Sequence, residues 1–462
     1  MAVTMTEQIR HHLSLMHGWI PTTVHVIAVV ALIAAIGWRT RRWRFVWVPW
    51  AVLVGVTLAI TAYWYVASEG LADNPAPPSL WIWIALSGVA AGVMVAGWRG
   101  DRWWRRGVSL LAVPLTVLCA ALSLNLWVGY YPTVLTAWNQ LTAGPLPDQT
   151  DPVAVTAMQK QHQIPAKGTL VPVDIADTAS GFRHRDELVY LPPAWYATDP
   201  PPPLPTIMMI GGEFNTPADW VRTGNAVKTI DDYAAAHGGN APVVVFVDPG
   251  GAFNNDTECV NGARGNAADH LTKDVVPYML SHYGVSANAA NWGIVGWSMG
   301  GTCAVDLAVM HPEMFGAFED IAGDLSPNSG NKTQTIDRLF NGNAAAYAAF
   351  DPSTVIAKHG AYSGVTGWFD TNSVNSTDQT AAANSLCGLG SANGIRCTVV
   401  TQPGKHDWPF AAQAFASALP WMASQIGTPG VPAVPLPGPP PAAPPTAPAT
   451  APQSAPYVQA SK

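Results

Sequence analysis

The first third of the chain contains four long apolar runs separated by short polar connections. Each run has roughly the 20 residues that a helix needs to cross a hydrocarbon layer of about 30 Å. Tryptophan and tyrosine gather near the ends of the runs, as side chains at the lipid–water interface do. The pattern therefore predicts four transmembrane helices, at about residues 19–38, 45–67, 80–98 and 108–128.

Arginine is distributed unevenly between the connections of this region. The connections at 39–44 and 99–106 each contain four arginines, whereas the connection at 68–79 has Glu69 and Asp73 but no Lys or Arg. Because positively charged connections stay in the cytoplasm, we expect both termini and everything after Tyr131 to lie outside it. The expected location is the cell membrane, with several spans and an extracytoplasmic domain. A cleavable signal peptide is not expected, since three more spans follow the first.

The four apolar runs contain no acidic residue, and His25 lies in the first of them. Proton relays within membranes usually combine histidine with carboxylates. We therefore interpret the four helices as an anchor rather than a transporter, with His25 in a helix contact or near the interface.

Beyond a proline-punctuated linker at 132–167, the pattern changes to alternating strands and helices. The continuous apolar runs at 205–210 and 242–247 are typical of strands buried on both faces. Alternation over residues 168–426 predicts an α/β domain with a mostly parallel sheet. The other expected strands are 169–175, 187–191, 291–295, 317–322, 364–369 and 397–401; the expected helices are 220–236, 267–283, 302–310 and 409–424.

The end of the chain, from Gly427 to Lys462, is rich in proline and alanine. Such a composition cannot build a core, so it predicts an extended and disordered tail. The expected organisation is a four-span anchor at 1–131, a linker at 132–167, the α/β domain at 168–426 and the tail at 427–462.

A Gly-x-Ser-x-Gly pentapeptide, residues 296–300, lies between the strand expected at 291–295 and the helix expected at 302–310. Strand, sharp glycine turn and helix form the nucleophile elbow of α/β-hydrolases, which projects a serine hydroxyl outward. Ser298 is therefore the candidate nucleophile. A plain glycine-rich loop at a strand end is the alternative.

The expected base is His406, because the order serine, acid, histidine places the histidine after the last strand. It would accept the Ser298 proton and return it to the leaving group. Two backbone N–H groups should stabilise the developing oxyanion. One belongs to Met299, directly after the nucleophile, and the other to Glu213 or Phe214 in the loop after the strand at 205–210.

The acid of the triad is expected to be Asp370, at the carboxyl end of the strand that precedes the strand of the histidine. There it would accept the Nδ1–H of His406 and stabilise the imidazolium. Asp324, one strand earlier, and Asp378, further along the loop, are the alternatives. Asp407 adjoins His406 and is poorly placed to face its ring.

Four of the five cysteines lie in the domain expected outside the cytoplasm, where disulfides form, and Cys119 lies in the fourth apolar run. The pairs Cys259–Cys303 and Cys387–Cys397 are expected, the first at one rim of the pocket and the second across a short loop. No C-x-x-C or zinc-like spacing occurs, so neither a metal nor another cofactor is predicted. The net charge of −7 gives no sign of nucleic-acid binding.

Several blocks of the domain resemble one enzyme family: Ile210-Gly-Gly, Val247-Asp-Pro-Gly-Gly-Ala-Phe253, Gly296-Trp-Ser-Met-Gly-Gly301 and Gly404-Lys-His-Asp-Trp-Pro409. They are similar to blocks of the putative-esterase family of α/β-hydrolases, which includes esterase D and the antigen 85 mycolyltransferases. The resemblance covers about residues 168–426 and implies an acyl-ester substrate, with Ser298 acylated and His406 as base. The spans and the Pro/Ala tail fit an actinobacterium; the secreted mycolyltransferases lack such spans.

These observations favour a membrane-anchored serine esterase or acyltransferase that acts on acyl esters, with lipids of the cell envelope, of mycolyl type, as one substrate class. A catalytically silent hydrolase-fold module that binds or organises the envelope is the alternative. The sequence names no protein partner.

Overall fold

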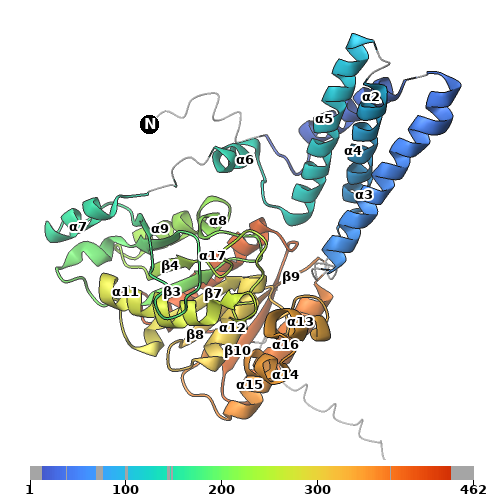
Figure 1. Cartoon of the computed structure of the whole chain (residues 1–462). Coiled ribbons are helices and arrows are strands. Elements are labelled where there is room, and N and C mark those ends of the chain that lie inside the picture. Colours follow the sequence, from blue (N-terminus) through green and yellow to red (C-terminus); the bar gives the residue numbers. More distant parts are fainter. Residues whose placement is uncertain are drawn as a thin grey trace, which may run out of the picture.

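The computed structural model describes residues 13–37, 39–68, 76–98, 102–142, 146, 149–374 and 376–438. Four long helices stand at one side of an α/β domain that is built around a single large sheet (Figure 1). Glu69, Asp73, Arg99 and the part of the expected tail at 439–462 lie outside the described residues.

The four helices are long and apolar enough to cross a membrane, as the sequence predicts. They comprise α2 (Trp19–Ile36), the π-turn η1 (Trp43–Trp47) continuing into α3 (Val48–Ser68), α4 (Pro78–Gly97) and α5 (Trp103–Val128). Small residues allow α3 and α4 to approach closely, since a Cβ added to Gly88 would lie 2.6 Å from the Cα of Gly55. His25 stacks on Trp83 of α4, with ring centroids 5.1 Å apart, which is the helix contact expected for it.

The sheet has eight strands in the order β1-β2-β4-β3-β7-β8-β9-β10. β2 is antiparallel to both β1 and β4, and the remaining pairs are parallel. The strands are β1 (Thr169–Val173), β2 (Glu187–Leu191), β3 (Thr206–Ile210), β4 (Val243–Val247), β7 (Trp292–Trp297), β8 (Ala317–Ile321), β9 (Thr366–Asn372) and β10 (Arg396–Gln402). Every residue of β3, β4 and β7 is buried, which explains their continuous apolar sequence.

Helices cover both faces of the sheet and enclose one apolar core on each side. One core includes α12 (Met299–Met310), α15 (Pro352–His359), α16 (Thr377–Ala392) and the continuous segment α10 (Ala267–Asp269), η3 (His270–Val275) and α11 (Val276–Tyr283). The other core includes α8 (Pro217–Arg222), α9 (Ala226–Ala236) and α17 (Trp408–Gln425). This strand order, with helices on both faces, is the α/β-hydrolase architecture that the sequence predicts.

The structure differs from the predicted elements in several places. The helix expected at 220–236 is two helices, because Asn225 between them has a φ of 55°, in the left-handed region. β9 continues to Asn372 rather than ending near residue 369. Between β8 and β9, where no element was predicted before the strand at 364, lie α13 (Lys332–Phe340), α14 (Ala344–Phe350) and α15.

The linker and the first part of the expected tail both pack on the domain. The linker contains α6 (Val134–Leu141) and α7 (Pro152–Lys160), and Leu146 contacts the core that includes α17. Val434 and Leu436 contact the same core, and the Thr398 hydroxyl of the edge strand β10 donates to the Pro437 carbonyl at 2.8 Å. Residues 427–438 therefore lie along the domain instead of extending away from it, because the apolar side chains of Val434 and Leu436 pack against the domain.

Candidate active site

Ser298 occupies the sharp turn between β7 and α12. Its backbone has φ 57° and ψ −120°, a strained conformation for a residue other than glycine. A Cβ on Gly296 would lie 1.6 Å from the carbonyl oxygen of Gly300, and a Cβ on Gly300 would lie 2.5 Å from that of Ile210. Side chains at either position would prevent the turn, so the glycines of the pentapeptide are required by its geometry.

The structure brings Ser298 and His406 together, although they are 108 residues apart in the chain. His406 lies between β10 and α17, and its Nε2 is 2.9 Å from Ser298 Oγ. The Trp297 ring stacks on the imidazole with centroids 4.3 Å apart. Burial lowers the pKa of His406 to about 4, so the ring is neutral near pH 7 and Nε2 can accept the serine proton.

The loop after β3 lies directly beside the nucleophile. A Cβ on Gly212 would lie 3.2 Å from the Cβ of Ser298, and the Gly212 N–H donates to Asn215 Oδ1 at 2.9 Å. Glu213 and Phe214 form the turn between these two residues, and Phe214 has a φ of 66°. Met299 begins α12, where the first amides of a helix have no partner within the helix itself. The two segments expected to supply the oxyanion hole therefore flank Ser298.

No hydrogen bond joins Asp370 to His406 in the part of the chain that the structure describes. Asp370 is buried within β9, where its Oδ1 accepts a 2.6 Å hydrogen bond from Gln402 Nε2 on the neighbouring strand β10. Burial raises the pKa of Asp370 to about 7, against the opposing effect of the Gln402 hydrogen bond. Among the described residues, none forms a hydrogen bond with the buried Nδ1 of His406.

Asp324 and Asp407 bond to other groups, and Asp378 is exposed. Asp324 accepts from Asn328 Nδ2 at 2.6 Å, and Asp378 is exposed in the first turn of α16. Asp407 caps α17 by accepting from the Phe410 N–H at 3.1 Å. The described residues thus show a serine–histidine pair whose Nδ1 side is buried without a carboxylate bonded to it.

The loop after β3 that contains Gly212, Glu213 and Phe214 is here called the oxyanion loop. An ion pair that holds this loop in place could not be predicted from the sequence. Arg185 forms an ion pair with buried Asp248, Nη2 to Oδ1 2.6 Å, and the same nitrogen donates to the Asn215 carbonyl at 2.7 Å. Burial acts to raise the pKa of Asp248, but Arg185 and the Gly250 N–H outweigh it and hold that pKa below its usual value. Arg185 and Asp248 are 63 residues apart, so only the fold shows that they meet.

Both expected disulfides are present in the structure. Cys259 bonds to Cys303 of α12, and Cys387 of α16 bonds to Cys397 of β10. The first bond ties the loop that follows β4 to the helix of the nucleophile. Cys119, in α5, is free and buried.

One group of side chains among the described residues has the spacing of a metal site: His184, Glu187 and His270, with ligand atoms within 4.8 Å of one another. Both ring nitrogens of His184 face carbonyl oxygens, of Ile175 at 2.6 Å and of Arg185 at 2.9 Å, so the ring donates from both. Burial acts to lower the pKa of His184, but these carbonyls and the Glu187 carboxylate raise it overall. Because both ring nitrogens of His184 already face carbonyl oxygens, the contacts fit a buried network of hydrogen bonds and ion pairs better than a metal site.

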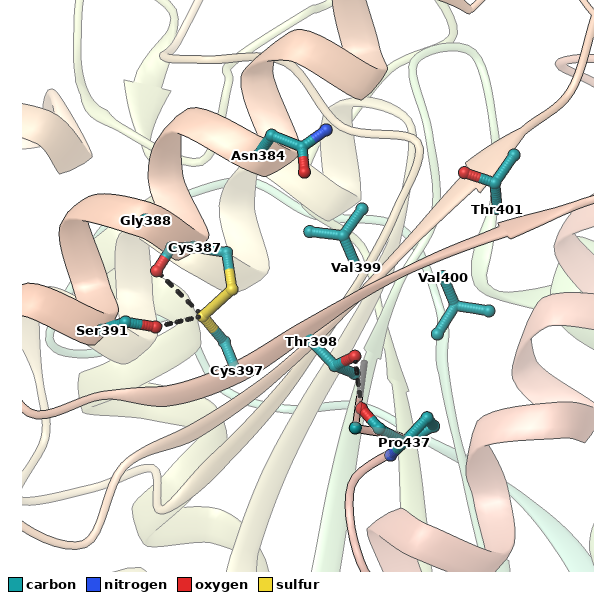
Figure 2. Close-up of a pocket in the computed structure, with 11 residues that line it drawn as sticks. Asn384, Cys387, Gly388, Ser391, Cys397, Thr398, Val399, Val400, Thr401 and Pro437 are labelled. Atoms are coloured by element: carbon teal, nitrogen blue, oxygen red, sulfur yellow. Dashed lines mark hydrogen bonds between the residues drawn. A yellow bond between two sulfur atoms is a disulfide. The ribbon is translucent and has the colours of Figure 1, made fainter. Parts of the chain in front are cut away.

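A hollow of about 610 Å³ opens beside the Cys387–Cys397 disulfide (Figure 2). α16, β10 and the segment at Pro437 and Gly438 line it, and none of the lining side chains is an acid or a base. It does not include Ser298 or His406, so it is not the reaction site.

A nucleophile elbow on this strand order defines the chain as an α/β-hydrolase. The chain belongs to the esterase family, because the family model described as "Putative esterase" matches residues 183–422. An uncharacterised protein of Corynebacterium glutamicum is 34% identical over 269 residues, 56% of this chain and 63% of that protein. The MPT51 antigen of Mycobacterium leprae is 27% identical over 139 residues, 28% of this chain and 43% of the antigen.

The chain thus spans less than two thirds of the length of these curated relatives. Among solved structures, an S-formylglutathione hydrolase from Agrobacterium tumefaciens aligns with 57% of this chain and 97% of its own. It has 16% sequence identity and a TM-score of 0.47.

Proposed function

We propose that this chain is a membrane-anchored serine esterase or acyltransferase whose hydrolase domain acts on acyl esters outside the cytoplasm. The observation that carries the proposal is the 2.9 Å contact between Ser298 Oγ and His406 Nε2 at a strained elbow. Membership of the esterase family supports an ester as substrate.

In the proposed mechanism, His406 accepts the Ser298 proton while Oγ attacks the ester carbonyl. The N–H of Met299 and an N–H of Glu213 or Phe214 bind the oxyanion of the tetrahedral intermediate. His406 then returns the proton to the departing alcohol, which leaves an acyl group on Ser298. Water completes a hydrolysis, and a sugar hydroxyl in its place completes an acyl transfer.

We propose lipids of the cell envelope, including mycolyl-type esters, as the substrate class. The resemblance of the sequence blocks to the antigen 85 mycolyltransferases supports this class. Four helices suited to a membrane would keep the domain beside such lipids.

Labelling with a fluorophosphonate probe tests the proposed nucleophile. The full chain should react covalently and cleave p-nitrophenyl acetate, and Ser298→Ala should lose the labelling and several orders of magnitude in kcat. Ser329→Ala is a matched control, because Ser329 is a buried serine of the same domain whose Oγ has no hydrogen-bond partner among the described residues. Equal labelling of the two variants would remove Ser298 from the mechanism.

A second candidate is a catalytically silent hydrolase-fold module that binds envelope components. The absence of a carboxylate bonded to His406 Nδ1 among the described residues favours it. The same experiment separates the candidates, since a silent module would leave the wild-type chain unlabelled.

A further inference from the structure

A short turn connects the last apolar helix to the rest of the chain. α5 ends at Val128, and Gly129, Tyr130 and Tyr131, here called the anchor turn, follow directly. Gly129 has a φ of 65°, and its N–H donates to the Asn125 carbonyl at 2.8 Å. The buried side chain of Asn125 accepts from the Tyr131 N–H at 2.6 Å and donates to the Tyr131 carbonyl at 2.9 Å. The turn is therefore fixed to the end of α5.

The first contact of the anchor turn is with the loop of the histidine. A Cβ on Gly129 would lie 2.4 Å from the Cβ of Asp407 and 3.3 Å from its Oδ2. Asp407 follows His406 directly and caps α17. Gly129 is buried, so the backbone of the turn packs against this residue and leaves no space for a side chain.

The second contact is with the helix that follows the oxyanion loop. Tyr130 packs against the core that includes Trp220 and Val221 of α8, and burial together with the Asp219 carboxylate of that helix raises the pKa of Tyr130. Asp219 is fully buried and accepts from the N–H of Thr216 at 2.6 Å and from its hydroxyl at 3.0 Å. Thr216 ends the loop whose Gly212 packs against Ser298.

We propose that the anchor turn is a positioning element of the active site. By holding Asp407 through Gly129 and α8 through Tyr130, it fixes the spacing between His406, the oxyanion loop and Ser298. The positions of Ser298 and His406 relative to each other then depend on the contact between the domain and the end of α5. This inference builds on the proposed function, because the geometry that it fixes is that of the serine–histidine pair.

A contact at the end of another apolar helix, α3, also joins the helices to the domain. At the end of α3, the carbonyl of Ser68 accepts a hydrogen bond from Arg338 Nη1 of α13. The ends of α3 and α5 that point toward the domain both lie beside it (Figure 1). The domain is thus held at two helix ends, and the turn near His406 is one of them.

The proposal is tested with Tyr130→Phe in the full chain in detergent micelles, with p-nitrophenyl acetate as the probe. This variant keeps the aromatic packing and removes only the hydroxyl, whose pKa the Asp219 carboxylate helps to raise. We expect kcat to fall roughly tenfold with KM changed less than about twofold, since small misplacements of catalytic groups cost up to about 10²-fold. Tyr63→Phe is the control, because Tyr63 is an exposed tyrosine of α3 outside the anchor turn and should keep wild-type kcat.

Hydrogen exchange gives a readout that does not depend on catalysis. Tyr130→Phe should speed the exchange of amides at 212–216 and 405–410, whereas Tyr63→Phe should not. Equal kcat values and equal exchange for the two variants would overturn the inference. If the wild-type chain neither labels nor cleaves the ester, the proposed function fails, and the exchange comparison alone then decides whether the turn positions the two loops.

Discussion

At the scale of single residues, the reactivity of the candidate site depends on how completely His406 is withdrawn from water. The imidazole is covered by Trp297 and faces Ser298 Oγ at 2.9 Å. Burial disfavours the imidazolium, which is the form that must appear when Ser298 loses its proton. A carboxylate near Nδ1 would oppose this penalty, and the described residues place none in hydrogen-bonding contact.

The low pKa of His406 predicts the pH dependence of the reaction. The base must be neutral, so protonation on acidification abolishes activity, and the folded pKa of about 4 sets the midpoint. We expect kcat/KM to stay level as the pH falls from about 7 to about 5 and to drop through about 4, instead of about 6.5 for an ordinary histidine. Cleavage of p-nitrophenyl acetate, with circular dichroism at each pH as a check on folding, measures this. A midpoint near 6.5 would contradict the lowering of the His406 pKa by burial.

The role of Asp370 is decided by Asp370→Asn. An asparagine amide can replace the carboxyl beside Gln402, and the structure shows no bond from Asp370 to His406. We therefore expect kcat to fall less than about tenfold, whereas loss of a triad acid costs roughly 10³–10⁴-fold. Asp378→Asn, at an exposed position of α16, is the control. A loss near 10³-fold specific to Asp370→Asn would show that its side chain leaves Gln402 for His406 during the reaction.

Ser298 and His406 could be located from the sequence, whereas the partner of His406 Nδ1 could not. The elbow depends on glycines that are local to Ser298, and the chain order of the fold places His406 after the last strand. The surroundings of Asp370 depend on how far β9 extends and on which side chain of β10 faces it. The length of β9 and the β10 side chain that faces Asp370 are determined by strand pairing, and a local sequence pattern does not predict them.

At the scale of elements, burial on two faces made the central strands predictable. β3, β4 and β7 are short, almost entirely apolar and fully buried. Their sequences therefore favour a strand that is buried on both faces. The helices α13 and α14 between β8 and β9 are short and were not predicted. Their positions depend on the packing of Leu339, Phe340 and Tyr347 into the core and not on a long periodic pattern.

The two disulfides should contribute unequally to stability. The bond Cys259–Cys303 joins residues 44 apart, and Cys387–Cys397 joins residues 10 apart. The chain-entropy model assigns about 4 kcal/mol to the first loop and about 2.7 kcal/mol to the second. Replacing both cysteines of a pair with alanine should thus lower Tm by roughly 10 °C for the first pair and roughly 6 °C for the second. Differential scanning fluorimetry measures both, and a larger effect of the second pair would contradict the loop-length argument.

At the scale of the whole molecule, several contacts bring the same ends of the helices to the domain. The backbone of residues 13–15 pairs with residues 132–134, which joins the start of α2 to the segment after α5. Ser68 at the end of α3 contacts Arg338 of the domain, and Gly129 after α5 contacts Asp407. Four successive helices that each cross a membrane would require this arrangement, because the first and last residues of an even number of spans emerge on one side.

The arginine distribution predicts the side of the membrane on which the domain lies, and the accessibility of introduced cysteines tests this prediction. Thr40 is exposed in the arginine-rich connection before α3, and Gln161 is exposed after α7 of the linker. With a membrane-impermeant maleimide on intact cells, Gln161→Cys should be labelled, and Thr40→Cys should be labelled only after the cells are permeabilised. The wild-type chain is the blank, since its domain cysteines are paired and Cys119 is buried. Labelling of Thr40→Cys alone in intact cells would place the domain in the cytoplasm and exclude an extracellular substrate for Ser298.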